Sequence, residues 1–293
     1  MLTEPSPVAL VTGASSGIGQ STARALAARS YRVALVARRE DRLRQLVTEI
    51  ESVGGSAFAI PADLAEDVER ERVVSAVRER WSRIDVVVNN AGLGWVSEYV
   101  KLPAERREAI LDVNVAALAH LTHLVLPEML GRRSGHIVNI GSVAGDVILP
   151  THVLYGASKA FVQAFSHGLS RELRGTGVFV TVVNPGPVRT EFRRVAMGVA
   201  VDRQPELESG IPAERVAAAV VDVLRRPCAS VYVPRYLQYA PLVELFLNWT
   251  DDQPSPHQSL QVWDHSGQPY VLCMDAKATQ AEDALSWART IKE

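Results

Sequence analysis

The chain has 293 residues, of which 47% are hydrophobic and 22% are charged, and its net charge is -2. That composition is typical of a globular protein with one sizeable core. A charge near zero gives no reason to expect nucleic acid or an anionic membrane as a partner.

Two cysteines, Cys228 and Cys273, are too few for a disulfide framework. The first residues lack the basic and apolar regions of a signal peptide. No apolar run approaches the roughly 20 residues that cross a bilayer. We therefore expect a reducing, cytoplasmic location and no membrane span.

Short apolar runs alternate with longer amphipathic segments between Val8 and about Val233. The runs, which we predict to be buried strands, are Val8–Val11, Val33–Val36, Ala57–Ile60, Val86–Val88, Ile137–Ile140, Val178–Val183 and Ser230–Val233. The amphipathic segments between them lie near 17–29, 40–53, 66–82, 103–131, 155–174 and 212–225. This alternation predicts an α/β fold with a doubly wound, seven-stranded parallel sheet and helices on both faces.

A glycine-rich loop, Thr12–Gly19, follows the first predicted strand. Its glycines permit a tight turn and a close backbone approach, and the next helix begins with free amide groups that suit a pyrophosphate. No Gly-Lys-Ser/Thr sequence closes the loop, so it is not a P-loop. The loop predicts a dinucleotide site, although a simple strand-to-helix turn would use similar residues.

The second predicted strand ends in Ala37-Arg38-Arg39, where a site for NAD commonly has an acidic residue. An arginine suits the 2′-phosphate of NADP instead, because its guanidinium matches phosphate geometry with paired donors. We predict NADP(H) as the cofactor. The alternative is that Arg38 and Arg39 are solvated surface charges.

Further polar residues follow other predicted strands, at the edge where ligands bind in open α/β sheets. Asp63 follows the third strand, Asn89 and Asn90 follow the fourth, and Pro185-Gly186 ends the sixth. Asn114 lies within a largely apolar helical segment and must find polar partners there. Each of these residues could instead satisfy local backbone groups.

Ser142, Tyr155 and Lys159 form the clearest candidate for catalysis. Ser142 follows the fifth predicted strand, and Tyr155 and Lys159 are four residues apart at a predicted helix start, so they share one helix face. A nearby cation favours the phenolate form of a tyrosine. We therefore expect Lys159 to lower the pKa of Tyr155, which would exchange a proton near neutral pH.

Taken together, these motifs resemble the short-chain dehydrogenase/reductase family over about residues 5–235. The matching pieces are Thr12-Gly-x-x-x-Gly17-x-Gly19, Asn89-Asn-Ala-Gly92, Asn114, Ser142, Tyr155-x-x-x-Lys159 and Pro185-Gly186. They occur in the family's order and at its usual spacings. The resemblance implies a Rossmann-like catalytic domain, which we expect to span residues 1–250.

The family's catalytic roles pass to four residues. Tyr155 would be the general acid in carbonyl reduction and the base in alcohol oxidation, and Ser142 would stabilise charge on the substrate oxygen. Lys159 would bind the nicotinamide ribose, and Asn114 would hold a water that relays protons. Hydride would pass between the nicotinamide and a carbonyl carbon or secondary alcohol.

The resemblance also implies a set of NADP(H)-binding residues. Asp63 would contact the adenine, Asn90 the adenosine-side ribose, Arg38 the 2′-phosphate, and Val188 and Thr190 the carboxamide. The full set expected to bind the cofactor is Gly13, Ser15, Ser16, Gly17, Ile18, Gly19, Arg38, Arg39, Asp63, Leu64, Asn90, Ala91, Gly92, Tyr155, Lys159, Pro185, Gly186, Val188 and Thr190. Family habit further suggests a homodimer or homotetramer.

The segments that choose substrates in this family are rich in apolar side chains here, which favours a hydrophobic substrate. They include Trp95, Val147, Ile148, Leu149, Val153, Leu154, Phe192 and Met197. Two alternatives remain open. One is a 3-oxoacyl-thioester reductase, and the other is a regulatory protein that binds the nicotinamide cofactor without turnover.

Residues 251–293 extend beyond the family's core, and we assign no function to them. Residues 251–258 are typical of a linker, and residues 260–263 and 269–274 flank a hairpin-turn signal. A helix is expected from Asp275 to Lys292. Before this extension, residues 235–249 form an apolar helix candidate that suits core or oligomer contacts. No metal site is expected, because the spacing of His257, His265 and Cys273 fits no common one.

Overall fold

The structure is a computed structural model that describes residues 6–147, 149–196, 210–242, 257–263 and 269–275. Its contacts divide the chain into two units, Met1–Pro241 and Leu242–Glu293. The first unit contains a seven-stranded sheet, and the second contains a sheet of two strands.

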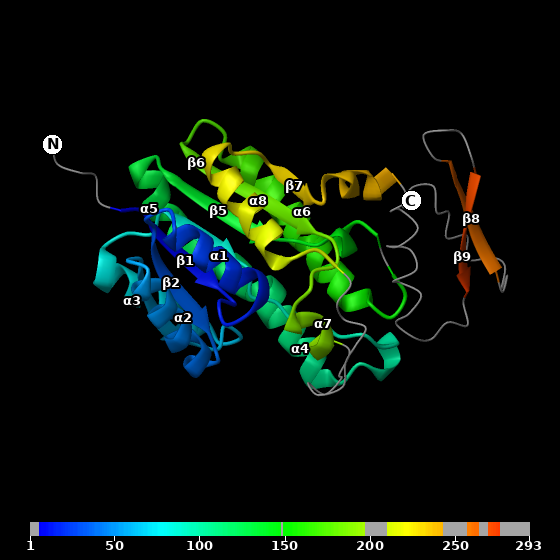
Figure 1. Ribbon diagram of the computed structural model, residues 1–293, viewed down its shortest axis with the longest axis horizontal. Coiled ribbons are helices and arrows are strands. Elements are labelled where there is room, and N and C mark those ends of the chain that lie inside the picture. Colours follow the sequence, from blue (N-terminus) through cyan, green and yellow to red (C-terminus); the bar gives the residue numbers. More distant parts are fainter. Residues whose placement is uncertain (1–5, 148, 197–209, 243–256, 264–268, 276–293) are drawn as a thin grey trace. The chain divides into compact units, whose positions relative to one another are not determined.

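The sheet of the first unit is parallel throughout, as the sequence predicts, and its order is β3-β2-β1-β4-β5-β6-β7 (Figure 1). Its strands are β1 (Val8–Thr12), β2 (Arg32–Ala37), β3 (Ser56–Pro61), β4 (Val86–Asn89), β5 (Gly135–Ile140), β6 (Val178–Pro185) and β7 (Ser230–Val233). The strand order reverses between β1 and β4. In such sheets, ligands bind beyond the carboxyl ends of the strands at this reversal.

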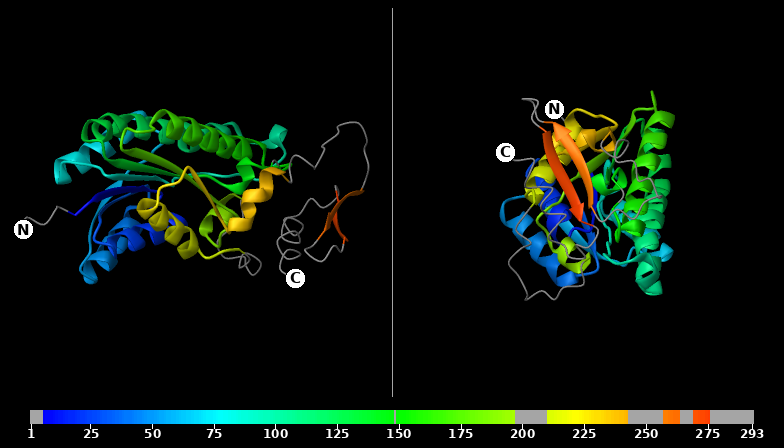
Figure 2. Two further views of the ribbon diagram at one scale, coloured as in Figure 1. Left: turned by 90° about the horizontal axis from the view of Figure 1, so that it is seen from above. Right: turned by 90° about the vertical axis from the view of Figure 1, so that its right-hand side faces the viewer.

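Two helical layers enclose the sheet, which the left view of Figure 2 shows edge-on between them. One layer contains α1 (Gly17–Ala27), α2 (Glu40–Ser52) and α8 (Ala213–Arg225). The other contains α3 (Asp67–Trp81), α5 (Ala117–Arg132) and α6 (Val153–Glu172). The predicted doubly wound α/β fold is confirmed.

The alternation of side chains along each strand builds a separate core on each face of the sheet. Ala9 and Val11 of β1 pack in the α1, α2 and α8 layer, whereas Val8 and Leu10 pack in the opposite layer. All four side chains are fully buried. Burial on both faces explains why the strands are continuous apolar runs in the sequence.

The helix predicted over 103–131 is not a uniform α-helix. It consists of α4 (Ala104–Leu111), a π-helical turn at Asp112–Ala116, and α5. A π turn inserts an extra residue into the helical ladder and is frequent at functional sites. The apolar periodicity could not reveal it, because the flanking turns keep ordinary helical spacing.

Two further boundaries differ from the prediction. β6 continues through Pro185, which pairs with Val233, although the prolines were expected to stop the strand. Proline lacks only the backbone N–H donor, so at the last residue of the strand it interrupts no hydrogen bond within the sheet. A short helix, α7 (Glu191–Ala196), was not predicted at all.

The stretch Ala104–Arg132 is the one described helix that is long and apolar enough to cross a membrane, with a mean hydropathy of 1.6 in its most apolar window. The expectation that no segment reaches such a length was therefore wrong. Within this stretch, Leu121, Val125 and Met129 are buried against the sheet. Its apolar composition thus serves the core, as in many helices of globular folds.

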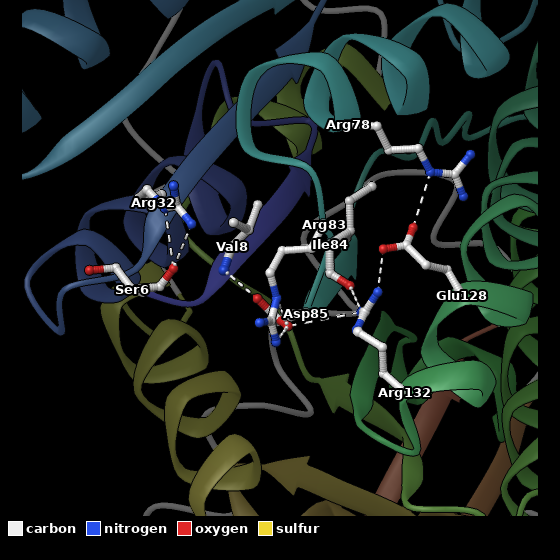
Figure 3. Close-up of polar contacts among 9 residues, drawn as sticks. All are labelled: Ser6, Val8, Arg32, Arg78, Arg83, Ile84, Asp85, Glu128 and Arg132. Atoms are coloured by element: carbon white, nitrogen blue, oxygen red, sulfur yellow. Dashed lines mark hydrogen bonds and ion pairs between the residues drawn. The ribbon is translucent and has the colours of Figure 1, made fainter. Parts of the chain in front are cut away.

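Charged groups close the opposite edge of the sheet, where the strands begin (Figure 3). Asp85 accepts a hydrogen bond from the backbone amide of Val8 at 2.8 Å and is paired with Arg83. Arg132 donates to the carbonyl oxygen of Ile84 at 2.8 Å. These contacts fix the start of β1 and β4 and lie away from the ligand-binding edge.

The second unit contains the predicted hairpin. β8 (His257–Trp263) and β9 (Pro269–Asp275) are antiparallel, with Trp263 opposite Pro269. The predicted linker was wrong at residues 257 and 258, which belong to β8. The expected helix to Lys292 lies outside the described residues. Of the apolar helix candidate, the structure describes a 3-10 turn at Arg235–Tyr239 and the residues up to Leu242.

His136 on β5 is buried, with 5% of its surface exposed, and its Nε2 lies 2.9 Å from the hydroxyl of Thr181 on β6. Burial lowers the pKa of His136 from 6.5 to about 4. A histidine whose pKa falls on folding binds fewer protons in the native state than in the unfolded chain. Its stabilising effect is therefore complete above pH 6.5 and is lost as the pH falls toward 4.

We expect the free energy of unfolding to fall by about 2 kcal/mol between pH 7 and pH 4.5 through His136 alone. Urea unfolding at both pH values would measure this in the wild type, in His136→Gln and in the exposed-site control His123→Gln. The difference between the two pH values should shrink in His136→Gln only. An unchanged difference in His136→Gln would show that folding does not lower the pKa of His136.

Candidate active site

Most of the predicted site residues meet at the carboxyl edge of the parallel sheet. The glycine-rich loop follows β1, Asn90 follows β4, Ser142 follows β5, and Gly186 follows β6. Residues far apart in the sequence therefore line one edge, beside the reversal between β1 and β4. This is the place where the fold leaves room for a ligand.

The glycine-rich loop needs its glycines for two different reasons. Gly13 and Gly17 have φ of 64° and 55°, in the left-handed region that other residues avoid. At Gly19, an added Cβ would lie 2.3 Å from the carbonyl oxygen of Gly13. The loop is thus folded tightly against itself before α1 begins at Gly17.

Asn90 holds this loop from β4. Its Nδ2 donates to the carbonyl oxygen of Thr12 at 2.8 Å, and its own amide donates to the Thr12 hydroxyl at 2.9 Å. Ala91 donates to the same hydroxyl at 2.9 Å. Asn90 therefore shapes the dinucleotide loop through the backbone, while its neighbour Asn89 is buried in the sheet, where it donates to Asn139 at 2.9 Å.

No side chain caps the N-terminus of α1, since Ser16 at the cap position makes no such bond. The amides of the first helical turn, which include Ile18 and Gly19, suit the phosphates of a dinucleotide. The missing Cβ atoms of Gly13, Gly17 and Gly19 let the loop pack against Asn90, Ala91 and Thr190. The residues of this loop fit a nicotinamide dinucleotide.

Two arginines at the end of β2 lie beside the loop but have different partners. Arg39 donates to the hydroxyls of Ser15 at 3.0 Å and Ser16 at 2.8 Å. Arg38 is more exposed, and its Nη1 lies 3.8 Å from an oxygen of Asp63. The structure thus places Arg39 directly on the glycine-rich loop and Arg38 beside the residue expected at the adenine.

The loop after β3 is held by a buried arginine. Arg70 on α3 donates to the carbonyl oxygens of Leu64 at 2.6 Å and Ala65 at 2.6 Å. Asp63 accepts from the amide of Ala65 at 3.1 Å, and Leu64 is 5% exposed. Asp63 and Leu64 therefore have a fixed backbone at the expected adenine position.

The segment after β6 returns toward the glycine-rich loop. Gly186 donates to the carbonyl oxygen of Val233 at 2.9 Å, and Val188 forms a parallel bridge with Ile211. Thr190 lies so close to Gly17 that an added Cβ there would be 2.8 Å from its methyl group. Thr190 is therefore near the start of α1, and its contact with the nicotinamide stays a prediction, as does that of Val188.

Ser142, Tyr155 and Lys159 are brought together by β5 and α6. The hydroxyl of Ser142 accepts the amide of Ala144 at 3.1 Å and is hydrogen-bonded to the phenol of Tyr155. Lys159 is 6% exposed, and its Nζ donates to the carbonyl oxygen of Ile140 at 2.8 Å. The same Nζ lies 5.9 Å from the centre of the Tyr155 ring.

The charges of this triad differ from the sequence expectation. Burial raises the pKa of Tyr155, and the hydrogen bond to Ser142 opposes that rise only in part. Burial also lowers the pKa of Lys159 to about 8. The net shift of the Tyr155 pKa is therefore upward, opposite to the expected direction, because desolvation is the largest effect on the phenol.

Asn114 lies in the π turn and is 2% exposed. Its side chain accepts from the amide of Leu93 at 2.7 Å and donates to the carbonyl of Leu93 at 2.8 Å and the hydroxyl of Ser158 at 2.9 Å. A Cβ added at Gly92 would lie 3.4 Å from Asn114 Oδ1 and 3.7 Å from Lys159 Nζ. A side chain at position 92 would therefore contact both Asn114 and Lys159.

Sequence reasoning missed a polar network behind Ser142. Gln163, one helical turn beyond Lys159, donates to the carbonyl oxygen of Ser142 at 2.9 Å and to Asp146 at 3.0 Å. The phenol of Tyr232 on β7 donates to the same oxygen of Asp146 at 3.0 Å. Burial raises the pKa of Asp146, against the opposing effect of these two hydrogen bonds.

An aromatic ring lies beside the phenol of Tyr155. The ring of Phe192 on α7 lies 5.6 Å from that of Tyr155, and a Cβ added at Gly94 would lie 2.9 Å from Phe192. The guanidinium of Arg106 lies over the ring of Trp95 at 4.8 Å. Of the apolar residues expected near the substrate, Ile148 and Met197 lie outside the described residues.

Comparison with known proteins agrees with this geometry. A family model for the short chain dehydrogenases matches residues 7–197. An uncharacterized oxidoreductase of Staphylococcus epidermidis is 35% identical over 220 residues, which cover 75% of this chain and 91% of that protein. The NADP-dependent 3-hydroxy acid dehydrogenase YdfG of Shigella flexneri is 38% identical over 190 residues, covering 64% and 75% of the two chains.

Among solved structures, a short-chain dehydrogenase from Sphingobium yanoikuyae in complex with NADPH superposes with a TM-score of 0.73. It is 31% identical, and the match covers 85% of this chain and 98% of that one. The region matched by the family model includes the glycine-rich loop and the Ser142–Tyr155–Lys159 triad. The chain therefore belongs to the short-chain dehydrogenase/reductase family of oxidoreductases.

Proposed function

We propose that this protein is an NADPH-dependent reductase of a ketone or aldehyde, able to run in reverse on a secondary alcohol. The observation that carries the proposal is the convergence of Ser142, Tyr155 and Lys159 beside a loop that fits a dinucleotide. The cofactor supplies the hydride chemistry when it is bound. The chain's own residues must then orient the carbonyl and deliver a proton.

Ser142 acts on the Tyr155 phenol as a hydrogen-bond partner, so their hydroxyl groups lie close together. A carbonyl oxygen placed there would accept from both, and these donors would stabilise the negative charge that develops as the carbon is reduced. Tyr155 is the proton donor. Its raised pKa keeps the phenol protonated at neutral pH, as a general acid requires.

Lys159 is suited to supply the proton that Tyr155 loses. Its pKa of about 8 lies close to neutrality, so it exchanges a proton readily. Asn114 lies near Lys159 across Gly92 and would hold the water that connects this lysine with solvent. The two side chains thus form the inner end of a proposed proton path.

The proposed preference for NADP(H) rests on the two arginines at the end of β2. Arg39 with Ser15 and Ser16 groups a guanidinium and two hydroxyls, which together suit a phosphate. Arg38 adds a second positive charge at the same strand end. The related proteins whose names specify NADP(H) are consistent with this preference.

The proposed substrate is hydrophobic, because Phe192 lies beside the phenol of Tyr155 and Gly94, the neighbour of Trp95, lies against Phe192. We further propose a cytoplasmic homodimer or homotetramer, as family habit suggests. A 3-oxoacyl thioester reductase remains the alternative enzyme. A cofactor-binding regulatory protein is the alternative from another functional class.

Tyr155→Phe should reduce turnover by roughly 100- to 10,000-fold, because the reaction loses its proton donor. NADPH consumption against a panel of aldehydes, aromatic ketones, steroids and acyl thioesters would measure this, with the affinity for NADPH expected to be unchanged. Surviving turnover would assign the acid to another residue. Tight NADPH binding without turnover by the wild type would favour the regulatory alternative.

Arg38→Ala should weaken NADPH binding by roughly tenfold while NADH binding changes little, because only NADPH carries the 2′-phosphate. Titration calorimetry with both cofactors would give the two dissociation constants. Arg44→Ala is a matched control, since Arg44 is an exposed arginine of α2 that pairs with Glu40. Equal weakening of both cofactors would contradict the assignment of Arg38 to the 2′-phosphate.

Gln163→Leu should lower the turnover number by roughly tenfold, because the backbone of Ser142 would lose a buried hydrogen bond. The affinity for NADPH should stay constant, since the hydrogen-bond partners of the Gln163 side chain, Ser142 and Asp146, are not among the residues expected to bind the cofactor. Tyr232→Phe, which removes only the distal partner of Asp146, should have a smaller effect. A variant that loses thermal stability yet keeps its turnover number would show that Gln163 does not position Ser142.

A further inference from the structure

Glu191 is the first residue of α7 and connects that helix with the expected phosphate site. One of its carboxylate oxygens accepts from Arg39 Nη1 at 2.7 Å, and the other accepts from Arg42 at 3.0 Å. Residues 39 and 191 are separated by 152 positions in the sequence. The bond therefore joins two parts of the chain that only the fold brings together.

The guanidinium of Arg39 is divided between two tasks. Its Nε and Nη2 face the hydroxyls of Ser15 and Ser16, whereas its Nη1 faces Glu191. A phosphate accepted by Arg39 and the two serines would thus approach a guanidinium that already carries a carboxylate. The two anions would share one cation and repel each other.

Glu191 is negatively charged across the neutral range. Arg39, followed by Arg42, holds the pKa of its carboxyl below the ordinary value. With 28% of its side chain exposed, the carboxylate is partly shielded from water, so its field is less screened than that of a surface residue. Its charge therefore acts on any phosphate bound at Arg39.

A cleft beside Glu191 leaves room for a phosphate to approach Arg39. Glu191 and Arg42 line a cleft of about 310 Å³ together with Ser16, Gly17 and Thr190. These neighbours belong to the glycine-rich loop and to the segment expected at the nicotinamide. The carboxylate thus lies at the border of the cofactor site, where neither the glycine motif nor the catalytic triad gives it a role.

We propose that Glu191 is an internal competitor of the 2′-phosphate, and that it limits how strongly this chain prefers NADPH over NADH. The inference rests on the proposed NADP(H) preference and adds a residue that opposes it. NADH lacks the 2′-phosphate, so Glu191 leaves its affinity unchanged. Removing the charge of Glu191 should therefore tighten binding selectively for phosphate-bearing ligands.

The test uses the whole chain and two nucleotide probes, adenosine 2′,5′-diphosphate and adenosine 5′-monophosphate, which differ only in the 2′-phosphate. Calorimetry at fixed ionic strength would compare the wild type with Glu191→Gln. We expect the variant to bind the 2′,5′-diphosphate roughly tenfold more tightly and the 5′-monophosphate with unchanged affinity. NADPH and NADH should show the same contrast.

Glu128→Gln is the matched control, because Glu128 also pairs with two arginines, Arg78 and Arg132, at the opposite edge of the sheet. It should shift neither probe. Glu191→Ser is a second variant that removes the charge with a smaller side chain, in case glutamine keeps Arg39 in place. Unchanged or weaker binding of the 2′,5′-diphosphate by both Glu191 variants would overturn the inference. Weaker binding would show that Glu191 holds Arg39 in the orientation that binds the phosphate.

The wild type separates this inference from the proposed function. If it bound both probes equally and consumed no NADPH, the NADP(H) proposal would fail, and the inference would fail with it. If it preferred the 2′,5′-diphosphate and the Glu191 variants bound it no more tightly, only the role of Glu191 would be lost.

Discussion

The burial of Lys159 is the constraint on which the geometry of the site depends. An ammonium group with 6% of its residue exposed loses most of its hydration, and it must recover that loss through hydrogen bonds. The carbonyl oxygen of Ile140, at the last position of β5, accepts from it at 2.8 Å. α6 is therefore fixed against the end of β5. Tyr155 and Gln163 lie one turn before and one turn after Lys159, so fixing the lysine also directs both of them toward Ser142.

Close backbone approach is the second condition, and it applies to both halves of the site. At Gly19, an added Cβ would lie 2.3 Å from the carbonyl oxygen of Gly13, which compacts the dinucleotide loop. At Gly145, an added Cβ would lie 2.7 Å from the carbonyl carbon of Lys159, which brings the turn after Ser142 onto α6. A side chain at either position would push apart the elements that form the site. The glycines therefore set the spacing that the polar contacts then hold.

Much of the fold followed from the sequence because local patterns decide it. Continuous apolar runs such as Val8–Thr12 identify strands buried on both faces, and the seven strands were placed to within two residues of their observed ends. The site motifs were also readable, since a glycine-rich turn and a Tyr-x-x-x-Lys pair each occupy a few consecutive residues. What the sequence could not show depends on distant contacts. Gln163 has partners 21 and 17 residues away, and nothing in an amphipathic helix distinguishes it from an ordinary polar residue.

The π turn around Asn114 and the helix α7 were missed for a related reason. A π turn changes the hydrogen-bond ladder without disturbing the apolar pattern on either side, so periodicity continues through it. α7 has six residues, fewer than two turns. Its contacts with other parts of the chain include a hydrogen bond from the amide of Val96 to its last carbonyl and the ion pairs of Glu191 with Arg39 and Arg42. Short elements of this kind are stabilised by what they touch rather than by propensity.

The charge states of Tyr155 and Lys159 show why sequence spacing alone misjudges an electrostatic effect. Spacing gives the distance between a phenol and an ammonium, but burial acts on each group separately. The same low-dielectric surroundings raise the pKa of Tyr155 and lower that of Lys159, because each prefers its neutral form there. A protonated tyrosine beside a lysine that exchanges protons near neutral pH is prepared to donate rather than to accept. A protonated phenol at this position is what the proposed carbonyl reduction requires of its acid.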